Sequence, residues 1–183
     1  MLFPGRWRAN RNWVSHSPMK LVIALFVLVT GPAVFAAEGI LFAGGGWAAI
    51  DRSGTCEALA RSVLLAPKGR TQASAGFAFT PDHRRWGEFH AQLSRAPRAG
   101  SSVLLNIGGQ PFLLVSRGGW AWSRGPVQEQ AIIAAIRTAG AMRVEARDGS
   151  GARFADPYVL DGAPTAIDAA AARCGLRGAG KIR

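Results

Sequence analysis

The sequence predicts a mainly β domain, built as a β-sandwich or a partly open barrel with two short helices. From Trp47 onward, about eight short apolar or alternating segments follow one another, and turns that contain Gly or Pro separate them. Two later segments, 128–139 and 164–174, have apolar residues at helical spacing instead. Removing a leader of 36 residues from the 183-residue chain leaves 147, enough for one domain with a core.

The leader has the pattern of a secretory signal peptide. An apolar run at 21–29 leads to small residues that end at Ala36, so we expect cleavage between Ala36 and Ala37. Four basic and no acidic residues precede the end of this run: Arg6, Arg8, Arg11 and Lys20. A retained membrane anchor is the alternative, but the run is shorter than the roughly 20 apolar residues that a spanning helix needs. Met1 and Met19 are both acceptable starts.

Export would place the protein in the periplasm or outside the cell, with membrane contact only through the signal peptide before cleavage. The full chain has 22 basic and 11 acidic residues, so loss of the four basic leader residues gives a net charge of +7. Because the arginines are scattered along the chain, the charge does not predict a specific nucleic-acid site. We expect a flexible lead-in at 37–46, the domain at 47–175 and a basic tail at 176–183.

Four strands are expected in the first half of the domain, at 47–51, 57–62, 75–79 and 88–93. Gly- and Pro-containing turns separate them. The fourth strand alternates most regularly, with apolar residues at its odd-numbered positions and polar residues, including His90, at its even-numbered positions. One face of this strand should therefore contact the core while the other faces solvent.

Four more strands are expected in the second half, at 103–107, 112–115, 142–147 and 152–155. The first two flank a Gly-Gly-Gln-Pro turn and predict a hairpin, and the last two flank an Asp-Gly-Ser-Gly turn. Trp120 and Trp122 lie in a further short strand or loop.

Helical spacing marks the segments 128–139 and 164–174. Gly140 follows the first, and the second has Pro164 in its first turn and Gly175 after its last. One apolar stripe of the second helix should face the core, and it is formed by Ile167, Ala170, Ala171 and Cys174. We therefore expect the Cys174 side chain to point inward.

Cys56 and Cys174 are the two cysteines of the chain. An even number of cysteines in an exported protein favours a disulfide, which here would tie the second helix to an early strand. Two free thiols or an intermolecular bond are the alternatives. A metal site is not expected, because cysteines so far apart lack the paired spacing of metal ligands.

Several of these features occur together in a known family. They are the leader, an early Trp47, Cys56, a hairpin around 107–109, a helix ending in Ala-Ile-Arg before an alternating strand, and Tyr-Val-Leu-Asp-Gly-Ala at 158–163 before a helix that ends in Cys174. In this pattern the chain resembles the invasion-associated locus B family of exported bacterial proteins, from about Trp47 to Cys174.

The resemblance implies an immunoglobulin-like β-sandwich in the periplasm or cell envelope, with the two cysteines as a structural bond. The family takes its name from host-cell invasion, so an envelope function or a host interaction is implied. No catalytic motif comes with the family, and no catalytic residue is transferred. The resemblance therefore predicts a non-catalytic interaction protein.

The residues themselves offer little for catalysis. The chain after the leader has two histidines, His83 and His90, and no serine in a Gly-x-Ser-x-Gly turn. Neither metal-ligand spacing nor a phosphate-binding loop with its lysine is present in the sequence. We expect no cofactor and no metal. A small envelope hydrolase with His83 or His90 as its base is the alternative.

The candidate binding site is a loop with two arginines between a histidine and a tryptophan: His83, Arg84, Arg85 and Trp86. Two guanidinium groups beside an indole can hold an acidic group and stack on an apolar or sugar surface. Trp120 and Trp122 could add a second platform, because residues two apart share one face of a strand. In the alternative, Trp86 and one of this pair cap the core and the arginines face water. The expected partner is an unidentified envelope or host protein or a glycan.

Overall fold

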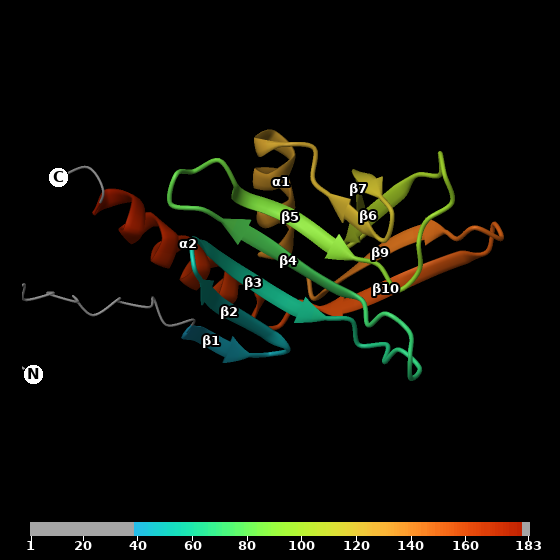
Figure 1. Ribbon diagram of the computed structural model, residues 1–183, viewed down its shortest axis with the longest axis horizontal. Coiled ribbons are helices and arrows are strands. Elements are labelled where there is room, and N and C mark those ends of the chain that lie inside the picture. The colour runs from blue at the N-terminus through green and yellow to red at the C-terminus, as the bar shows by residue number, and fades with distance from the viewer. Residues whose placement is uncertain (1–38, 181–183) are drawn as a thin grey trace, which may run out of the picture. The chain divides into compact units, whose positions relative to one another are not determined.

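The computed structural model describes residues 39–180, which form ten antiparallel strands and two helices (Figure 1). The strands are β1 (Gly39–Gly44), β2 (Trp47–Arg52), β3 (Thr55–Arg61), β4 (Ser74–Phe79), β5 (Trp86–Gln92), β6 (Val103–Ile107), β7 (Gln110–Arg117), β8 (Trp120–Trp122), β9 (Ala141–Arg147) and β10 (Arg153–Val159). The helices are α1 (Pro126–Ile136) and α2 (Ala163–Ala179). Within 39–180, neither helix is long and apolar enough to cross a membrane.

The two helices pack against different parts of the sheet. Helix α2 contacts β1, β2, β3 and β4, whereas α1 contacts mainly β5 and, less extensively, β6 and β7. Figure 1 shows α2 running beside β2 and β3, and α1 beside β5. The described residues form one compact unit with its own hydrophobic core.

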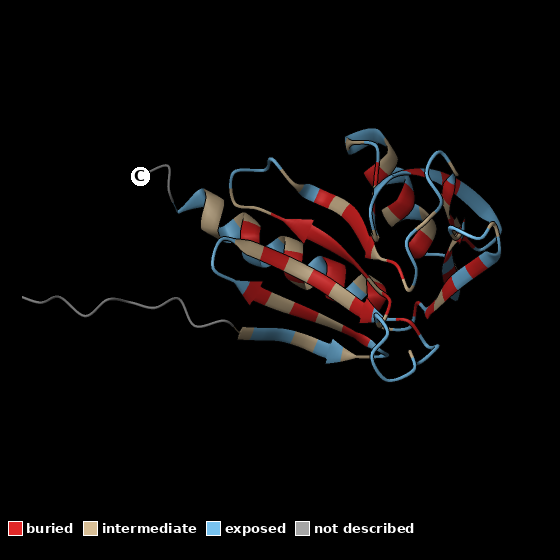
Figure 2. Ribbon diagram, turned by 45° about the vertical axis from the view of Figure 1, so that its right-hand side comes forward, coloured by how far each residue is buried: buried red, intermediate tan, exposed pale blue. Residues whose placement is uncertain are grey.

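The core lies between the sheet and the helices. Buried residues alternate with more exposed ones along β2, β3 and β9, as Figure 2 shows for the strands in its foreground. Phe77 is at its centre, with ring centroids 6.3 Å from Trp47 and 5.4 Å from Phe89. Trp47 also donates its indole N–H to the carbonyl oxygen of Val159 at 2.9 Å, which ties β2 to the end of β10.

The mainly β character and the two helices are confirmed, but a sandwich of two separate sheets is not. The strand order is β1-β2-β3-β4-β5-β8-β7-β6-β9-β10, and all ten strands belong to one sheet. Strand β7 pairs with β8 on one side and with β6 on the other, and so joins the two halves. Strand β5 pairs with β8 and β6 pairs with β9, and because these partners are far apart in the chain, strand propensity does not predict the pairings.

Residues 39–44 of the expected flexible lead-in form the edge strand β1. Gly45 and Gly46 have φ angles of 58° and 86° and connect Gly44 to its partner Trp47. Positive φ at both residues of a two-residue turn is typical of the type I′ turns that close hairpins. The run of three glycines is therefore a hairpin turn and not a flexible linker.

The helix boundaries also differ from the prediction. Helix α2 does not stop before Gly175 but continues to Ala179, and it takes in part of the expected tail. Helix α1 begins and ends earlier than the predicted 128–139. Glycine is a weak stop signal when tertiary contacts hold the helix, and Gly175 packs against the ring of Trp86.

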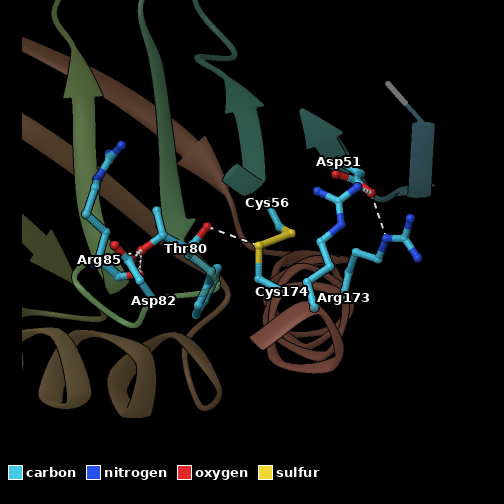
Figure 3. Close-up of a disulfide and its surroundings, with 9 residues drawn as sticks. Asp51, Cys56, Thr80, Asp82, Arg85, Arg173 and Cys174 are labelled. Atoms are coloured by element: carbon cyan, nitrogen blue, oxygen red, sulfur yellow. Dashed lines mark hydrogen bonds and ion pairs between the residues drawn. A yellow bond between two sulfur atoms is a disulfide. The ribbon is translucent and has the colours of Figure 1, made fainter. Parts of the chain in front are cut away.

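Cys56 of β3 and Cys174 of α2 form a disulfide, which confirms the predicted intramolecular pairing (Figure 3). Their Cα atoms lie 5.8 Å apart, and both residues are buried. The inward direction expected for Cys174 is thereby confirmed. The predicted signal peptide at 1–36 and its cleavage site between Ala36 and Ala37 lie outside the described residues.

Candidate functional site

The predicted binding loop connects β4 to β5, and a short hydrogen-bond network orders it (Figure 3). Thr80 donates its hydroxyl to Asp82 at 2.5 Å, and its oxygen accepts the N–H of Arg85 at 3.1 Å. Asp82 also accepts the N–H of Arg84 at 3.1 Å. The Thr80 hydrogen bond and then the Arg84 N–H lower the pKa of the Asp82 carboxyl. The loop therefore has a defined shape although it is exposed to solvent.

His83 and Trp86 stack on one another in this loop. Their ring centroids are 3.9 Å apart and their planes differ by 15°. Trp86 also meets Phe79 edge-on, with centroids 5.3 Å apart. Among residues 39–180, His83 is the one non-glycine residue with a positive φ, at 58°. This conformation costs roughly 1–2 kcal/mol, and such strain concentrates at ligand-binding positions.

A bulge turns Trp86 toward the helices. The pairing register of β4 and β5 shifts between Trp86 and Glu88, so Gly87 is an extra residue on β5. Gly87 has a φ of 80°, and a Cβ atom there would lie 2.8 Å from Cδ1 of Ile133 on α1. The shift places Trp86 opposite Phe79, on the face that the helices cover. Glycine thus allows both the bulge and the close approach of α1.

The last turns of α2 support the loop. A Cβ atom on Gly178 would lie 2.7 Å from the carbonyl oxygen of Pro81 and 3.8 Å from Nε2 of His83. A Cβ atom on Gly175 would lie 3.6 Å from the ring of Trp86. The two glycines are three residues apart and therefore share one side of the helix. The loop packs directly on the helix backbone, which it can reach because Gly175 and Gly178 have no side chains.

Two long-range restraints hold this end of α2 in place. The disulfide joins Cys174 to β3, and Sγ of Cys174 lies 3.2 Å from the carbonyl oxygen of Phe79. Asp51 of β2, only 2% exposed, accepts hydrogen bonds from Arg173 at 2.6 Å and Arg177 at 2.7 Å (Figure 3). Because the Asp51 carboxylate is removed from water, it depends on these two guanidinium groups for its stability.

An open groove of about 830 Å³ lies between the loop, α1 and α2. The loop contributes His83 and Arg84 to its lining, Trp86 of β5 contributes its ring, and Glu129 of α1 and Arg137 just after this helix complete the polar part. Apolar residues of β4, α1 and α2 also line it. This volume lies within the roughly 300–1,000 Å³ that is usual for small-ligand sites.

Opposite charges meet in and around the groove. Arg137, which follows the last residue of α1, donates to both oxygens of Asp168 on α2, at 2.5 and 3.2 Å, and so ties the two helices together. Glu88 pairs with Arg85 at 2.8 Å. The Arg84 side chain lies 3.5 Å from the exposed carboxylate of Asp82 but is itself 88% exposed. Arg84 is therefore the guanidinium group most available to a ligand.

Glu129 is a buried carboxyl group in the groove, with its hydrogen-bond partner beside it. It is 7% exposed and accepts the hydroxyl of Ser123 at 2.9 Å. Burial raises the pKa of Glu129, the Ser123 hydrogen bond lowers it, and the nearby charge of Glu88 raises it. A carboxyl group with a raised pKa accepts hydrogen bonds when ionised and can donate one when protonated.

The structure brings together only part of the predicted site. Arg85 is turned toward Glu88 and is not part of the groove lining. Trp120 and Trp122 also lie outside the lining, on β8, with ring centroids 6.4 Å apart and planes that differ by 17°. They form an aromatic pair of their own, not a second wall of the groove.

His90 does not face solvent as the alternation predicted. It is 8% exposed, and its ring centroid lies 6.4 Å from that of Trp120. On the neighbouring strand a Cβ atom on Gly76 would lie 3.1 Å from Nε2 of His90, so the missing side chain gives the imidazole its space. Burial lowers the pKa of His90. His83 is exposed in its loop, so the two histidines have different surroundings.

Sequence reasoning missed the roles of the helix residues that line the groove or support its loop. Glu129 lies in the first turn of α1, and Gly175 and Gly178 lie inside α2, where glycine is unfavourable. Glycine inside a helix indicates a close tertiary contact, whereas a glutamate in the first turn is ordinary placement near the positive end of the helix dipole. The sequence does not show which segment contacts these residues, and the groove forms only where the loop, α1 and α2 meet.

Comparison with known proteins gives no identification. No family model, no curated protein and no solved structure matches the chain. Function is therefore inferred from the groove and the sequence pattern, and the resemblance to the invasion-associated locus B family stays a prediction.

Proposed function

We propose that the protein is a non-catalytic interaction protein of the bacterial envelope, and that the groove beside Trp86 binds a glycan. One observation carries the proposal. The stacked rings of His83 and Trp86 lie at a groove that also presents guanidinium and carboxylate groups. Aromatic rings next to such polar groups can engage both the apolar face and the hydroxyl groups of a sugar.

The indole ring of Trp86 suits the apolar face of a pyranose. The residue is 37% exposed, and its contacts with His83 and Phe79 set the orientation of the ring. A rigid aromatic side chain loses little conformational entropy when a ligand binds. Trp86 is therefore a preorganised platform.

The polar groups of the groove suit sugar hydroxyls. The carboxylates of Glu88, Glu129 and Asp168 can accept hydrogen bonds, and the guanidinium groups of Arg84 and Arg137 can donate them. Since both kinds of group are present, a neutral sugar or one with an acidic substituent fits better than a small ion of either sign.

The sequence pattern supports the envelope location. The leader predicts export, and a buried disulfide is usual in exported domains. The resemblance to the invasion-associated locus B family favours an envelope or host-contact role and a periplasmic or secreted location. The immunoglobulin-like sandwich implied by that resemblance remains part of the proposal.

Binding to an envelope glycan is the test. The chain from Ala37 onward, which contains the whole described core, is incubated with purified peptidoglycan and with soluble fragments released from it. The groove variant carries Arg84→Ala and Trp86→Ala, and the matched control carries Trp120→Ala and Trp122→Ala. We expect the parent and the control to bind and the groove variant to lose binding while its thermal unfolding stays cooperative. Equal binding by all three chains would contradict the proposed site.

A second candidate function is glycoside hydrolysis in the same groove, favoured by the buried Glu129 beside Glu88. Two carboxyl groups in different environments form the acid and base pair of many glycosidases. Burial raises the pKa of Glu129, which suits a proton donor, while Arg85 pairs with Glu88. Release of new reducing ends that Glu129→Gln abolishes would favour hydrolysis. Binding without such release would favour the non-catalytic role.

A further inference from the structure

The loop between β3 and β4 exposes three consecutive aliphatic side chains. Val63, Leu64 and Leu65 are 54%, 60% and 86% exposed. In Figure 1 this loop projects beyond the strands, at the end of the sheet away from the last turn of α2. Single exposed leucines are common, but a run of three on one projecting loop indicates a function.

The loop holds its shape through its own hydrogen bonds. Gln72 accepts the N–H of Ala66 at 2.9 Å and donates to the carbonyl oxygens of Ser62 and Leu64, each at 3.2 Å. Ser62 donates its hydroxyl to the carbonyl oxygen of Pro157 at 3.0 Å. Backbone groups are thus satisfied inside the loop while the aliphatic side chains stay outside. The apolar exposure is a built feature of the loop.

The same loop is basic. Residues 61–72 include Arg61, Lys68 and Arg70, all exposed, and no acidic residue. No ion pair within 39–180 involves any of the three. Their charges are therefore available to an anionic surface.

A second groove, of about 980 Å³, lies beside the loop. Leu64, Leu65 and Arg70 line it from the loop, and Arg153 lines it from β10. Arg153, like Arg70, has no carboxylate partner within the described part of the chain. Aliphatic side chains and unpaired guanidinium groups thus occur side by side.

The carboxylates of this second groove are already engaged. Asp148 pairs with Arg95 at 3.0 Å. Asp156, 2% exposed, accepts the N–H of Ser94 at 3.0 Å. Neither carboxylate forms an ion pair with the two free guanidinium groups, so the groove keeps a positive charge toward the solvent.

We propose that the loop at 61–72 docks the protein on an anionic lipid surface. Leu64 and Leu65 enter the interface between headgroups and acyl chains, while Lys68, Arg70 and Arg153 contact lipid phosphates. Apolar insertion combined with basic charge is how peripheral proteins bind anionic membranes reversibly. The site is independent of the glycan groove and adds a membrane contact after loss of the leader.

A lipid surface fits this loop better than a protein partner does. Side chains on a projecting loop can enter a soft lipid interface without a matching pocket. Anionic headgroups complement a segment that has three basic residues and no acidic one. A membrane is therefore the expected partner of this loop, and the vesicle experiment distinguishes it from a protein partner.

Vesicle co-sedimentation tests the proposal with the chain from Ala37 onward, so that the apolar leader cannot contribute. The probes are vesicles of phosphatidylglycerol with phosphatidylethanolamine, and vesicles of phosphatidylcholine alone. We expect binding to the anionic vesicles that weakens as salt is added. Leu64→Asn with Leu65→Asn should weaken it by about tenfold or more, because two leucines no longer leave water. Lys68→Gln with Arg70→Gln should weaken it several-fold and reduce its salt dependence.

The matched control replaces two exposed aliphatic residues elsewhere, Val127→Asn with Leu176→Asn. It should bind anionic vesicles like the parent. All variants change exposed residues, and a melting curve for each verifies the fold. Failure of the parent to bind anionic vesicles would overturn the proposal and leave a protein partner as the explanation. Equal binding by the Leu64 and Leu65 variant would overturn it as well.

Discussion

The groove beside Trp86 and the loop at 61–72 are two exposed surfaces that the fold builds in different ways. The groove depends on contacts between distant segments: the disulfide spans 118 residues, and the pair of Asp51 with Arg173 spans 122. In the loop, Gln72 bonds to partners at most ten residues away, and one anchor on β10 completes the structure. One surface is shaped by the tertiary fold and the other largely by its own sequence.

This difference predicts that each surface can be damaged without the other. A change that frees the end of α2 should alter the groove, because the loop at 80–86 rests there. The loop at 61–72 makes none of these contacts and should keep its shape while the sheet is folded. Substitutions at each surface test that separation.

Loss of the disulfide is expected to have the largest effect. Replacing Cys56 and Cys174 by alanine removes a cross-link that the chain-entropy model values at roughly 4–5 kcal/mol for so long a loop. In a domain of this size, Tm should fall by about 10–20 °C. Calorimetry measures the change, and reduction of the parent, verified by thiol titration, should reproduce it. Reductant should not affect the double variant, and an unchanged Tm in the variant would contradict the structural role.

Removal of both arginine partners of Asp51 should come next. Arg173→Ala with Arg177→Ala leaves a carboxylate that is 2% exposed without a cation, at a cost of about 3–5 kcal/mol. Urea unfolding gives the free energy of unfolding. Adding Asp51→Asn to the double variant should recover part of the loss, since the unpaired charge is then gone. If the triple variant is no more stable than the double variant, the buried charge is not the cause.

The two restraints differ in how far the sequence predicts them. The inward position of Cys174 follows from helical spacing, and with two cysteines an intramolecular disulfide has a single pairing. The partners of Asp51 do not follow, because nothing near Asp51 in the sequence indicates the end of α2. The pairing of β5 with β8 is likewise not predicted, because β6 and β7 lie between them in the chain. Local patterns predict which side chains are buried, and tertiary contacts decide what each one meets.

The candidate site was predictable to the same extent. Residue types identified the loop with His83 and Trp86, but not its support on Gly178 or the groove wall with Glu129. Hairpin β1–β2 was missed because a run of glycines has the composition of a linker, although positive φ at Gly45 and Gly46 makes it a turn. These features need φ angles or long-range contacts, which residue types alone do not supply.

Gly178→Ala tests the support of the groove directly. Its Cβ atom would meet the carbonyl oxygen of Pro81 at 2.7 Å, and relief of that overlap costs about 1–3 kcal/mol. Alanine's better helix propensity returns about 1 kcal/mol. These two effects on stability oppose each other, so Tm should change little. Glycan binding should weaken clearly, because the loop that carries His83 is displaced from α2. Gly180→Ala is the matched control, because its Cβ atom would meet only carbonyl oxygens of its own helix, at 3.7 and 3.9 Å. Equal binding by both variants would mean that Gly178 does not position the loop.

Gln72→Ala makes the opposite test, on the loop at 61–72. It removes the four hydrogen bonds of the Gln72 side chain, and we expect a loss of about 1–2 kcal/mol because the freed backbone groups can reach water. Vesicle binding should weaken as the loop loses its shape, while glycan binding stays at the parental level. Hydrogen exchange should rise in the loop and not in α2. Increased exchange in both regions would show that the surfaces are not independent.

The smallest expected effect is a change in pH dependence at the groove. Because burial raises the pKa of folded Glu129 above its ordinary value of 4.5, the folded chain holds this proton more tightly than the unfolded chain. As the pH rises above 4.5 the unfolded state ionises first, so this group's contribution to the free energy of unfolding falls until the folded carboxyl has also ionised. Glu129→Gln should lack that fall. Urea unfolding at a series of pH values measures it.

The control for this titration is Glu145→Gln, which removes a carboxylate from the outer side of β9. The stability difference between Glu129→Gln and the parent should grow with pH and then level off, and Glu145→Gln shows what loss of a carboxylate elsewhere does to the same measurement. Parallel pH courses for all three chains would mean that Glu129 is not desolvated. The loop at 61–72 has no acidic residue, so no carboxyl group of its own should make its vesicle binding follow this titration. A shared pH course for glycan binding and vesicle binding would therefore argue that the two surfaces are coupled after all.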